Sequence, residues 1–203
     1  MKKALLFVNG EPPTHFPQSL TQYDYIACTD GAYHSYLLQT DITPHFIIGD
    51  LDSLHKQPIA ENIEIIHTPD QSKTDFEKAL LFLVSKGIQA FDIYGATGHA
   101  TDHFLGNLSV AKQYYHQYQL TFYDNYCYFF FLQKETTLTN VKNKTISLIP
   151  LTEVHELTLT GFLYPLTNQS LQLGGFTSLR NKAIDNNISI TFTGGDLLLF
   201  VSL

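Results

Sequence analysis

The sequence predicts an α/β domain with a mainly parallel, Rossmann-like sheet, followed by a smaller all-β domain of sandwich or jelly-roll type. In the first part of the chain, short apolar runs alternate with helical patterns, which is typical of parallel strands joined by helices. In the last part, only short alternating segments separated by turn residues remain. We therefore expect two domains in this chain of 203 residues, one over residues 1–130 and one over residues 131–203.

Six apolar runs in the first domain have the length of strands, and most of them end at Gly, Asn, Asp or Pro. These residue types favour tight turns, so each such run marks a strand followed by a loop. The predicted strands are residues 4–8, 25–28, 46–48, 63–67, 91–94 and 120–123.

Two segments of the first domain carry apolar residues at helical spacing. Residues 74–86 place their apolar residues on one face, and Thr74 with Glu77 forms a capping box at the start. Residues 102–115 carry one apolar stripe, with Asp102 in the first turn. Both segments are predicted helices between parallel strands.

The second domain shows the two-residue alternation of half-buried strands. Its last two segments flank a Thr-Gly-Gly-Asp turn, so we expect them to pair as a hairpin. The predicted strands are residues 145–149, 154–159, 188–193 and 197–201, with a short helical piece near 181–184.

The composition excludes several classes of protein. Twelve Lys and Arg against 19 Asp and Glu give a formal net charge of −7, which does not suit a nucleic-acid-binding surface. The apolar run 126–132 is too short to cross a membrane, and the N-terminal run stops at Asn9, too early for a secretion signal. Cys28 and Cys127 are expected to be buried free thiols, which favours the cytoplasm. Only one of the cations is an arginine, Arg180.

Aspartates follow the ends of several predicted strands. Ligands of open α/β sheets bind outside the carboxyl ends of the strands, so these turns are expected at the binding edge. A single Asp in a turn is an ordinary turn former. Several together repel one another unless a cation lies between them, and Mg²⁺ with nucleotide phosphates suits such a group. The residues are Asp30, Asp50, Asp52, Asp70 with Asp75, and Asp102.

Other nucleotide and metal motifs are absent or weak. The sequence has neither a G-x-x-x-x-G-K-[ST] phosphate loop nor a G-x-G-x-x-G dinucleotide fingerprint after a strand. His99 and His103 have a spacing that could bind Zn²⁺ on a helix, but His99 precedes the predicted helix. The interpretation of both as ordinary solvent or turn histidines is favoured.

Taken together, these loops resemble the thiamin pyrophosphokinase family. The resemblance extends over nearly the whole chain and is most specific in the first domain. It is carried by Gly-Asp-Leu-Asp-Ser at 49–53, Thr-Pro-Asp-Gln-x-x-Thr-Asp-Phe-x-Lys-Ala-Leu at 68–80, Gly-Ala-x-Gly-x-x-x-Asp-His-x-Leu-x-Asn at 95–107, and Gly-x-x-Tyr-Pro-Leu at 161–166.

The resemblance implies an enzyme that transfers pyrophosphate from ATP to the hydroxyl of thiamin in thiamin diphosphate biosynthesis. It implies ATP and Mg²⁺ on the α/β domain, thiamin on the β domain of the partner chain, and a homodimer with shared active sites. By position, Asp50, Asp52 and Asp75 are similar to the Mg²⁺ ligands, and Asp102 to the acidic residue at the reacting end. The remaining ligand-side residues are Asp30, Gln71, Thr74, Lys78, Arg180 and Asn181.

Two departures from the family pattern concern arginine. The family typically has Gly-Arg before the Asp-His pair, where this chain has His99-Ala100, and it tends to have Ser-Asn where this chain has Arg180-Asn181. One hypothesis is that Arg180 reaches across the dimer to the phosphates. The alternative is that Arg180 is a solvated loop residue and that Lys73 or His99 serves the phosphates.

Two rival functions remain open on the sequence. One is a related pyrophosphokinase that uses a pterin alcohol, and the C-terminal β domain argues against it. The other is a catalytically weak sensor of thiamin or nucleotide, which the missing arginine keeps open.

Overall fold

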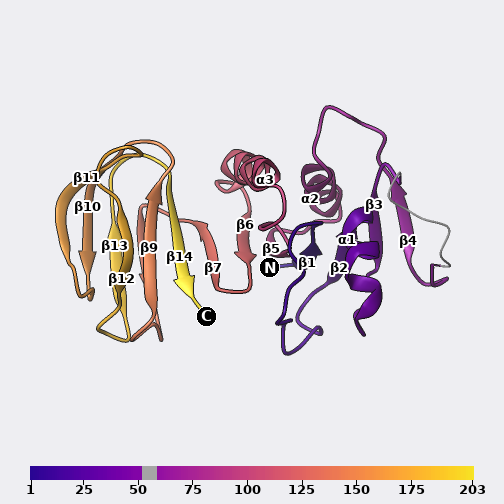
Figure 1. The fold of residues 1–203 in the computed structure, drawn as a ribbon, viewed down its shortest axis with the longest axis horizontal. Helices are drawn as coiled ribbons and strands as arrows, with labels where there is room; N and C mark the ends of the chain where they lie inside the picture. The colour runs from indigo at the N-terminus through magenta and orange to yellow at the C-terminus, as the bar shows by residue number, and fades with distance from the viewer. Residues whose placement is uncertain (52–58) are drawn as a thin grey trace. The chain divides into compact units, whose positions relative to one another are not determined.

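The computed structural model describes residues 1–51 and 59–203. The chain forms two compact units, Met1–Asn125 and Tyr126–Leu203, each of which is described by itself (Figure 1). No helix within the described ranges combines the length and the apolar character needed to span a membrane.

The N-terminal unit contains a parallel sheet in the strand order β6-β5-β1-β2-β3-β4. The predicted parallel sheet is therefore confirmed, and each predicted strand overlaps an observed one. The strands are β1 (Lys3–Phe7), β2 (Tyr25–Thr29), β3 (Phe46–Gly49), β4 (Glu64–His67), β5 (Ala90–Tyr94) and β6 (Gln119–Tyr123).

The strand order reverses beside β1. The chain runs outward from β1 through β2, β3 and β4, and β5 then pairs with the other edge of β1. In an open parallel sheet, such a reversal leaves a crevice at the carboxyl ends of the two strands that flank it. The crevice between β1 and β5 is therefore the expected ligand site.

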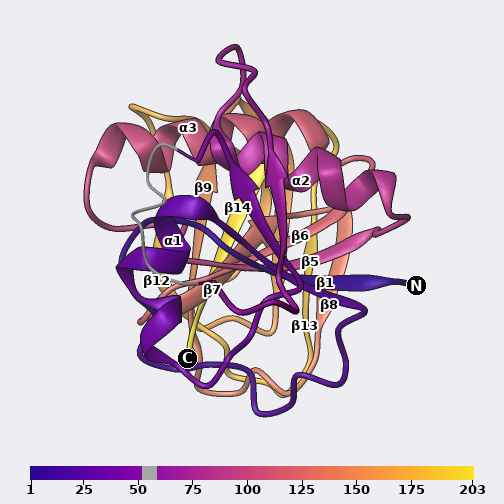
Figure 2. The ribbon, with the colours of Figure 1, turned by 90° about the vertical axis from the view of Figure 1, so that its right-hand side faces the viewer.

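Helices cover both faces of this sheet. On one face, α2 (Asp75–Ser85) packs on β2 and β3, and α3 (Thr101–Tyr114) lies beside α2 (Figures 1 and 2). The Tyr114 hydroxyl joins the two helices by donating to Glu77 Oε1 at 2.9 Å. On the other face, α1 (Asp30–Ser35) and the 3₁₀ helix η1 (Leu37–Gln39) contribute to an apolar cluster with Phe7 and Ile47. Both predicted helices are confirmed within a residue or so, whereas α1 had not been predicted.

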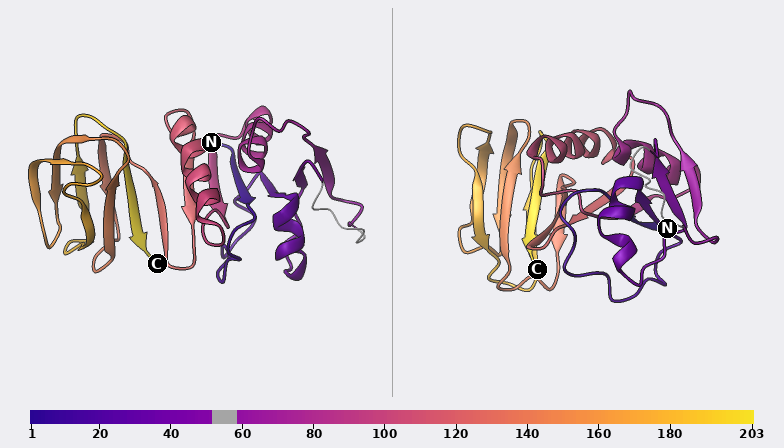
Figure 3. Two further views of the ribbon diagram at one scale, coloured as in Figure 1. Left: turned by 45° about the horizontal axis from the view of Figure 1, so that its top comes forward. Right: turned by 45° about the vertical axis from the view of Figure 1, so that its right-hand side comes forward.

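The C-terminal unit is entirely β. Its strands form two antiparallel groups, β12-β9-β14-β7 and β11-β10-β13-β8 (Figure 3). One apolar core is drawn from both groups. The predicted all-β class is confirmed. The strands are β7 (Cys127–Phe131), β8 (Glu135–Leu138), β9 (Thr145–Pro150), β10 (Val154–Thr160), β11 (Leu166–Leu171), β12 (Ser178–Lys182), β13 (Ile188–Thr191) and β14 (Leu197–Ser202).

Two local predictions in this unit were wrong. The strands on either side of the Thr-Gly-Gly-Asp turn do not form a hairpin, because β13 pairs with β10 and β8 whereas β14 pairs with β7 and β9. The turn instead carries the chain from one group of strands to the other. The expected helical piece near 181–184 is also absent, since β12 runs to Lys182 and the following Ile184 amide donates to the Gly161 carbonyl.

Candidate active site

A cavity of about 540 Å³ opens at the carboxyl ends of β1, β2 and β5 in the N-terminal unit. It lies beside the strand-order reversal, where a parallel sheet is expected to bind a ligand. The first turns of α2 and α3 form part of its wall, and no Lys or Arg occurs among its described lining residues. Its polar side chains come from Asn9, Thr29, Thr74, Asp75, His99, Asp102, His103 and Asn107.

Close backbone approach shapes the floor of this cavity. Gly95 has a φ of +72°, and a Cβ at this position would overlap the Val8 carbonyl oxygen, so only glycine fits without a shift. The Val8 amide donates to the Tyr94 carbonyl at 2.8 Å, and the Val8 carbonyl accepts from the Tyr36 hydroxyl at 2.8 Å. The ends of β1 and β5 are thus held together beneath the ligand space.

A buried hydroxyl at this floor has no partner. Thr29 is 1% exposed, lines the cavity, and its Oγ1 makes no hydrogen bond within the part of the chain that the structure describes. A buried polar group without a partner is costly, which makes this hydroxyl a candidate contact for a polar ligand.

The start of α3 presents backbone amides to the cavity. Its N-cap residue, Ala100, has no side chain that could cap the helix, and the acidic residue of its first turn is Asp102. Asp102 Oδ1 accepts from the His103 amide at 2.9 Å, and Asn107 Nδ2 donates to the Ala96 carbonyl at 2.9 Å. Asn107 thereby ties the loop after β5 to the second turn of the helix.

The start of α2 shows one half of the predicted capping box. Thr74 Oγ1 accepts from the Glu77 amide at 3.2 Å. Asp75 follows at the first helical position, and its Oδ1 lies 3.1 Å from Lys78 Nζ. The Lys78 side chain is only 4% exposed, so its charge is paired with Asp75 within the protein.

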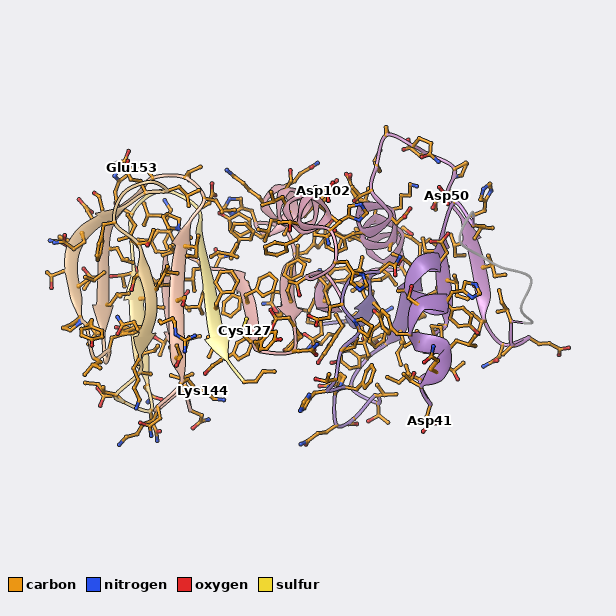
Figure 4. All side chains as sticks on the ribbon, in the orientation of Figure 1. Asp41, Asp50, Asp102, Cys127, Lys144 and Glu153 are labelled. Carbon is orange, nitrogen blue, oxygen red and sulfur yellow. The ribbon has the colours of Figure 1, made fainter. Side chains whose placement is uncertain are left out.

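Asp50, after β3, is joined to the loop after β4. Gln71 Nε2 donates to Asp50 Oδ2 at 3.2 Å. Figure 4 shows Asp50 and Asp102 along the upper edge of the N-terminal unit. Asp70, in contrast, forms a local turn: it accepts from the Ser72 hydroxyl at 2.6 Å, and from the Ser72 amide and Lys73, and these bonds hold its pKa well below the usual range.

The pKa of Asp30 is affected by two of the other predicted aspartates. Burial is the largest cause that raises the pKa of Asp30, and the charges of Asp75 and Asp50 raise it further. The amides of Gly31 and Leu51 lower it without cancelling these effects. Since like charges gathered in one place favour a bound cation, Asp30, Asp50 and Asp75 mark a cation-attracting edge. Asp52, which had also been predicted here, lies outside the described residues.

The donor chemistry of this edge fits Mg²⁺. Within the described ranges, no group of three or more His, Cys, Asp or Glu side chains could hold a metal ion by itself. Mg²⁺ bound with a nucleotide commonly takes one or two carboxylates and completes its shell with phosphate oxygens and water. Asp50 and Asp75 are carboxylates of this kind.

The two predicted residues of the second domain have different surroundings. Asn181 is 3% exposed; its Nδ2 donates to the Tyr164 carbonyl at 2.7 Å, and its Oδ1 accepts from the amides of Tyr164 and Lys182. Arg180 is exposed, has a φ of +53°, and lines a second cavity of about 370 Å³ with Tyr126 and Phe200 among its walls. Asn181 therefore shapes the backbone near Tyr164, while Arg180 is exposed at the wall of the second cavity.

The structure thus gathers most of the predicted N-terminal residues at one edge. Thr74, Asp75 and Asp102 line the cavity, and Gln71 is bonded to Asp50. The sequence reasoning missed Thr29, whose only signal is a polar residue at the last position of an apolar strand.

The chain matches two family models in succession. Residues 16–122 match the model described as the catalytic domain of thiamin pyrophosphokinase. Residues 123–197 match the model described as the vitamin B1 binding domain of thiamin pyrophosphokinase.

Individual proteins give the same picture. Thiamine pyrophosphokinase of Bacillus subtilis (strain 168) is 33% identical over 175 residues, which cover 82% of both chains. The crystal structure of thiamine pyrophosphokinase from Bacillus subtilis covers 98% of both chains, with a TM-score of 0.84 and 27% identity. That of a thiamin pyrophosphokinase family protein from Enterococcus faecalis covers 100% of this chain and 99% of its own, with a TM-score of 0.86 and 26% identity.

Proposed function

The chain belongs to the thiamin pyrophosphokinase family, and from this premise we propose that it transfers the pyrophosphate group of ATP to the hydroxyl of thiamin, giving thiamin diphosphate and AMP. It is a transferase of the thiamin diphosphokinase type. The observation that carries the proposal is the succession of both family models along one chain, with carboxylates gathered beside a cavity in the first.

ATP is proposed to bind in the cavity of the N-terminal unit. Three features support this: the position at the strand-order reversal, the amides at the start of α3, and the unpartnered Thr29 hydroxyl. Thr74 and Gln71 are proposed on the phosphate side. Lys78 is proposed to act there through its ion pair with Asp75.

Mg²⁺ is the proposed metal, with Asp50, Asp75 and Asp52 as its ligands. When bound, it would neutralise charge on the phosphate oxygens. The support from the described residues is the mutual repulsion of the carboxylates at this edge, which a cation relieves.

The proposed transfer forms one bond to the β-phosphorus and breaks another. The thiamin hydroxyl oxygen attacks the β-phosphorus of ATP, the bond from that phosphorus to the oxygen bridging it to the α-phosphorus breaks, and AMP leaves with that oxygen. Asp102 is exposed in the first turn of α3 and is proposed to orient the hydroxyl by accepting a hydrogen bond from it, and the hydroxyl proton is released as the new bond to phosphorus forms. Correct positioning of the two substrates supplies much of the remaining acceleration.

Thiamin is proposed to bind on the C-terminal unit of the partner chain in a homodimer, within the cytoplasm. Exposed large apolar side chains in this unit, such as Tyr164, Phe176 and Leu179, support an interface or an aromatic ligand there. Arg180 is proposed to contact the phosphates from the partner, because the described lining of the ATP cavity carries no Lys or Arg. Asn181 is proposed to hold the backbone of this thiamin site.

The direct test follows the products of the purified protein with ATP, Mg²⁺ and thiamin by chromatography. We expect AMP and thiamin diphosphate in equal amounts, and a loss of at least about a hundredfold in turnover for Asp75→Asn. A pterin alcohol that replaces thiamin with equal turnover would favour the related pyrophosphokinase. Thiamin binding without any AMP would favour a sensor and contradict the proposal.

A further inference from the structure

Asp30, the first residue of α1, places both of its carboxylate oxygens on backbone amides. Its Oδ1 accepts from the Gly31 amide at 2.7 Å, and its Oδ2 accepts from the Leu51 amide at 3.0 Å. The residue is 2% exposed. The second bond connects the end of β2 to the loop that follows β3, so Asp30 joins two neighbouring strand ends.

The turn that Asp30 holds is both tight and strained. A Cβ at Gly49 would overlap the Asp30 carboxylate, so the carboxylate lies directly against the backbone of this turn. Leu51 has a φ of +71°, a left-handed conformation that is unfavourable for a residue with a side chain. A strained conformation of this kind persists only where its surroundings impose it. The hydrogen bond from the Leu51 amide to Asp30 holds this conformation.

Asp50 stands between these two points of contact. Its Oδ2 accepts from Gln71 Nε2 at 3.2 Å, so the carboxylate is reached by the loop after β4. Any rotation at Leu51 or Gly49 would redirect the Asp50 side chain. The direction of Asp50 therefore depends on Asp30, although the two carboxylates repel each other.

We propose that Asp30 is a positioning residue that clamps the Gly49–Leu51 turn and so aims Asp50 at the divalent cation, rather than a ligand of ATP or metal. This assignment rests on the proposed function, since the cation is the one that accompanies ATP. Replacing a residue that orients a metal ligand through hydrogen bonds commonly weakens metal affinity by about 10- to 100-fold.

The test measures Mn²⁺ binding in the presence of ADP by electron paramagnetic resonance, together with Mg²⁺-dependent turnover. Asp30→Asn keeps the shape of the side chain but leaves one of the two amides without an acceptor. We expect it to weaken Mn²⁺ binding about tenfold and to lower kcat, with the KM for thiamin changed less than about twofold. Asp24→Asn is the matched control, because Asp24 Oδ2 also accepts a backbone amide, that of Lys3 at 2.8 Å, away from the site.

A second substitution separates positioning from ligation. In Asp30→Asn/Leu51→Gly, glycine adopts the left-handed conformation without strain, so the turn needs less support from residue 30. We expect the double variant to recover at least about threefold of the lost Mn²⁺ affinity, since the strain of the left-handed conformation is removed. Asp50→Asn/Leu51→Gly should show no recovery relative to Asp50→Asn, because the ligand itself is altered.

The outcomes are distinct. Loss of Mn²⁺ binding in Asp30→Asn that Leu51→Gly does not restore would make Asp30 a ligand and overturn the inference, as would unchanged binding in Asp30→Asn. If Asp30→Asn does not fold, Gly49→Ala is the alternative. Its Cβ would displace the Asp30 carboxylate without removing it, and it should weaken Mn²⁺ binding similarly. A wild-type protein that binds Mn²⁺ but releases no AMP overturns the proposed function alone.

Discussion

At the scale of the residue, the Thr29 hydroxyl is the clearest candidate for a contact with a ligand. It is buried at the end of β2, lines the cavity and has no partner among the described residues. A polar atom in this situation lowers stability unless a ligand supplies a hydrogen bond. Removing the hydroxyl should therefore maintain or raise the stability of the ligand-free protein and lower its affinity for the substrate.

Thr29→Val tests this opposition. Valine has nearly the same shape without the hydroxyl, so we expect the free energy of unfolding of the ligand-free protein to stay equal or rise by up to about 1 kcal/mol. The KM for ATP should rise about fivefold, the equivalent of one hydrogen bond. Urea unfolding and steady-state kinetics measure the two effects, and Thr29→Ser, which keeps the hydroxyl, is the control. Lower stability with an unchanged KM would show that the hydroxyl serves the fold alone.

The sequence predicted which acidic residues lie at the strand ends, but it did not predict the structural role of each one. Asp30, Asp50 and Asp70 all follow strand ends and look equivalent in the sequence. The structure separates them: Asp30 clamps a distant amide, Asp50 accepts from Gln71, and Asp70 closes its own turn. These differences depend on which loops become neighbours, and that is decided by the strand order rather than by local residue types.

At the scale of the element, β5 and β6 are joined by stacked tyrosines. The rings of Tyr94 and Tyr123 lie 4.9 Å apart at an interplanar angle of 8°. Burial is the main cause that raises the pKa of Tyr94 to about 12, with the charge of Asp92 adding to it. The folded protein therefore keeps this phenol protonated at a pH where the unfolded chain releases the proton.

This difference predicts alkaline destabilisation. Because the folded pKa of Tyr94, about 12, exceeds the ordinary value of 10.0, its contribution to stability is present below pH 10 and is lost as the pH rises toward 12. Tyr94→Phe keeps the ring and removes the titration. We expect the free energy of unfolding of the wild type to fall as the pH rises from 10 to 12. In Tyr94→Phe this decrease should be smaller by roughly 2 kcal/mol, as measured by urea unfolding at each pH. Equal slopes in the two proteins would contradict this.

The elements that the sequence revealed are those whose local pattern is sufficient. The parallel strands were recognisable as apolar runs, and α2 by its Thr74–Glu77 cap, which the structure retains. Helix α1 spans only Asp30–Ser35, and a helix of that length is too short for an apolar period to repeat. The hairpin expected around Gly194 failed because strand alternation specifies which face is buried but not which strand is the partner.

At the scale of the whole molecule, the proposed reaction needs two units with separate tasks. Each unit has its own apolar core. The ATP cavity and Asp102 belong to the N-terminal unit, whereas Arg180 belongs to the C-terminal unit. If active sites are shared between chains, defects in different units can compensate each other in a mixed dimer.

Mixing Asp102→Asn with Arg180→Glu tests the shared site. Each variant alone should lose most of its turnover, Asp102→Asn at the reacting end and Arg180→Glu through charge reversal near the phosphates. After co-expression, half of the dimers are mixed and each of these has one intact site, so we expect roughly a quarter of wild-type turnover. The measurement is AMP release by the purified mixture.

The matched control pairs Asp102→Asn with Asp75→Asn. Both changes lie in the N-terminal unit, so no mixed dimer contains an intact site and turnover should stay at the level of the single variants. If mixed dimers of the first pair are isolated and remain inactive, the active site is not shared in this way.

The strand order of the N-terminal unit also affects how the protein is made. Strand β1, at Lys3–Phe7, is synthesised before the other strands of the unit, yet one of its two hydrogen-bonded neighbours is β5, at Ala90–Tyr94. Residues Ala4 to Phe7 are fully buried in the finished unit, so during synthesis this apolar strand must wait for much of the unit to emerge before both of its edges are paired. A nascent chain of this kind is prone to aggregation and is a suitable substrate for a chaperone. Deleting the first seven residues would likewise remove a central strand of the sheet rather than trim a loose end.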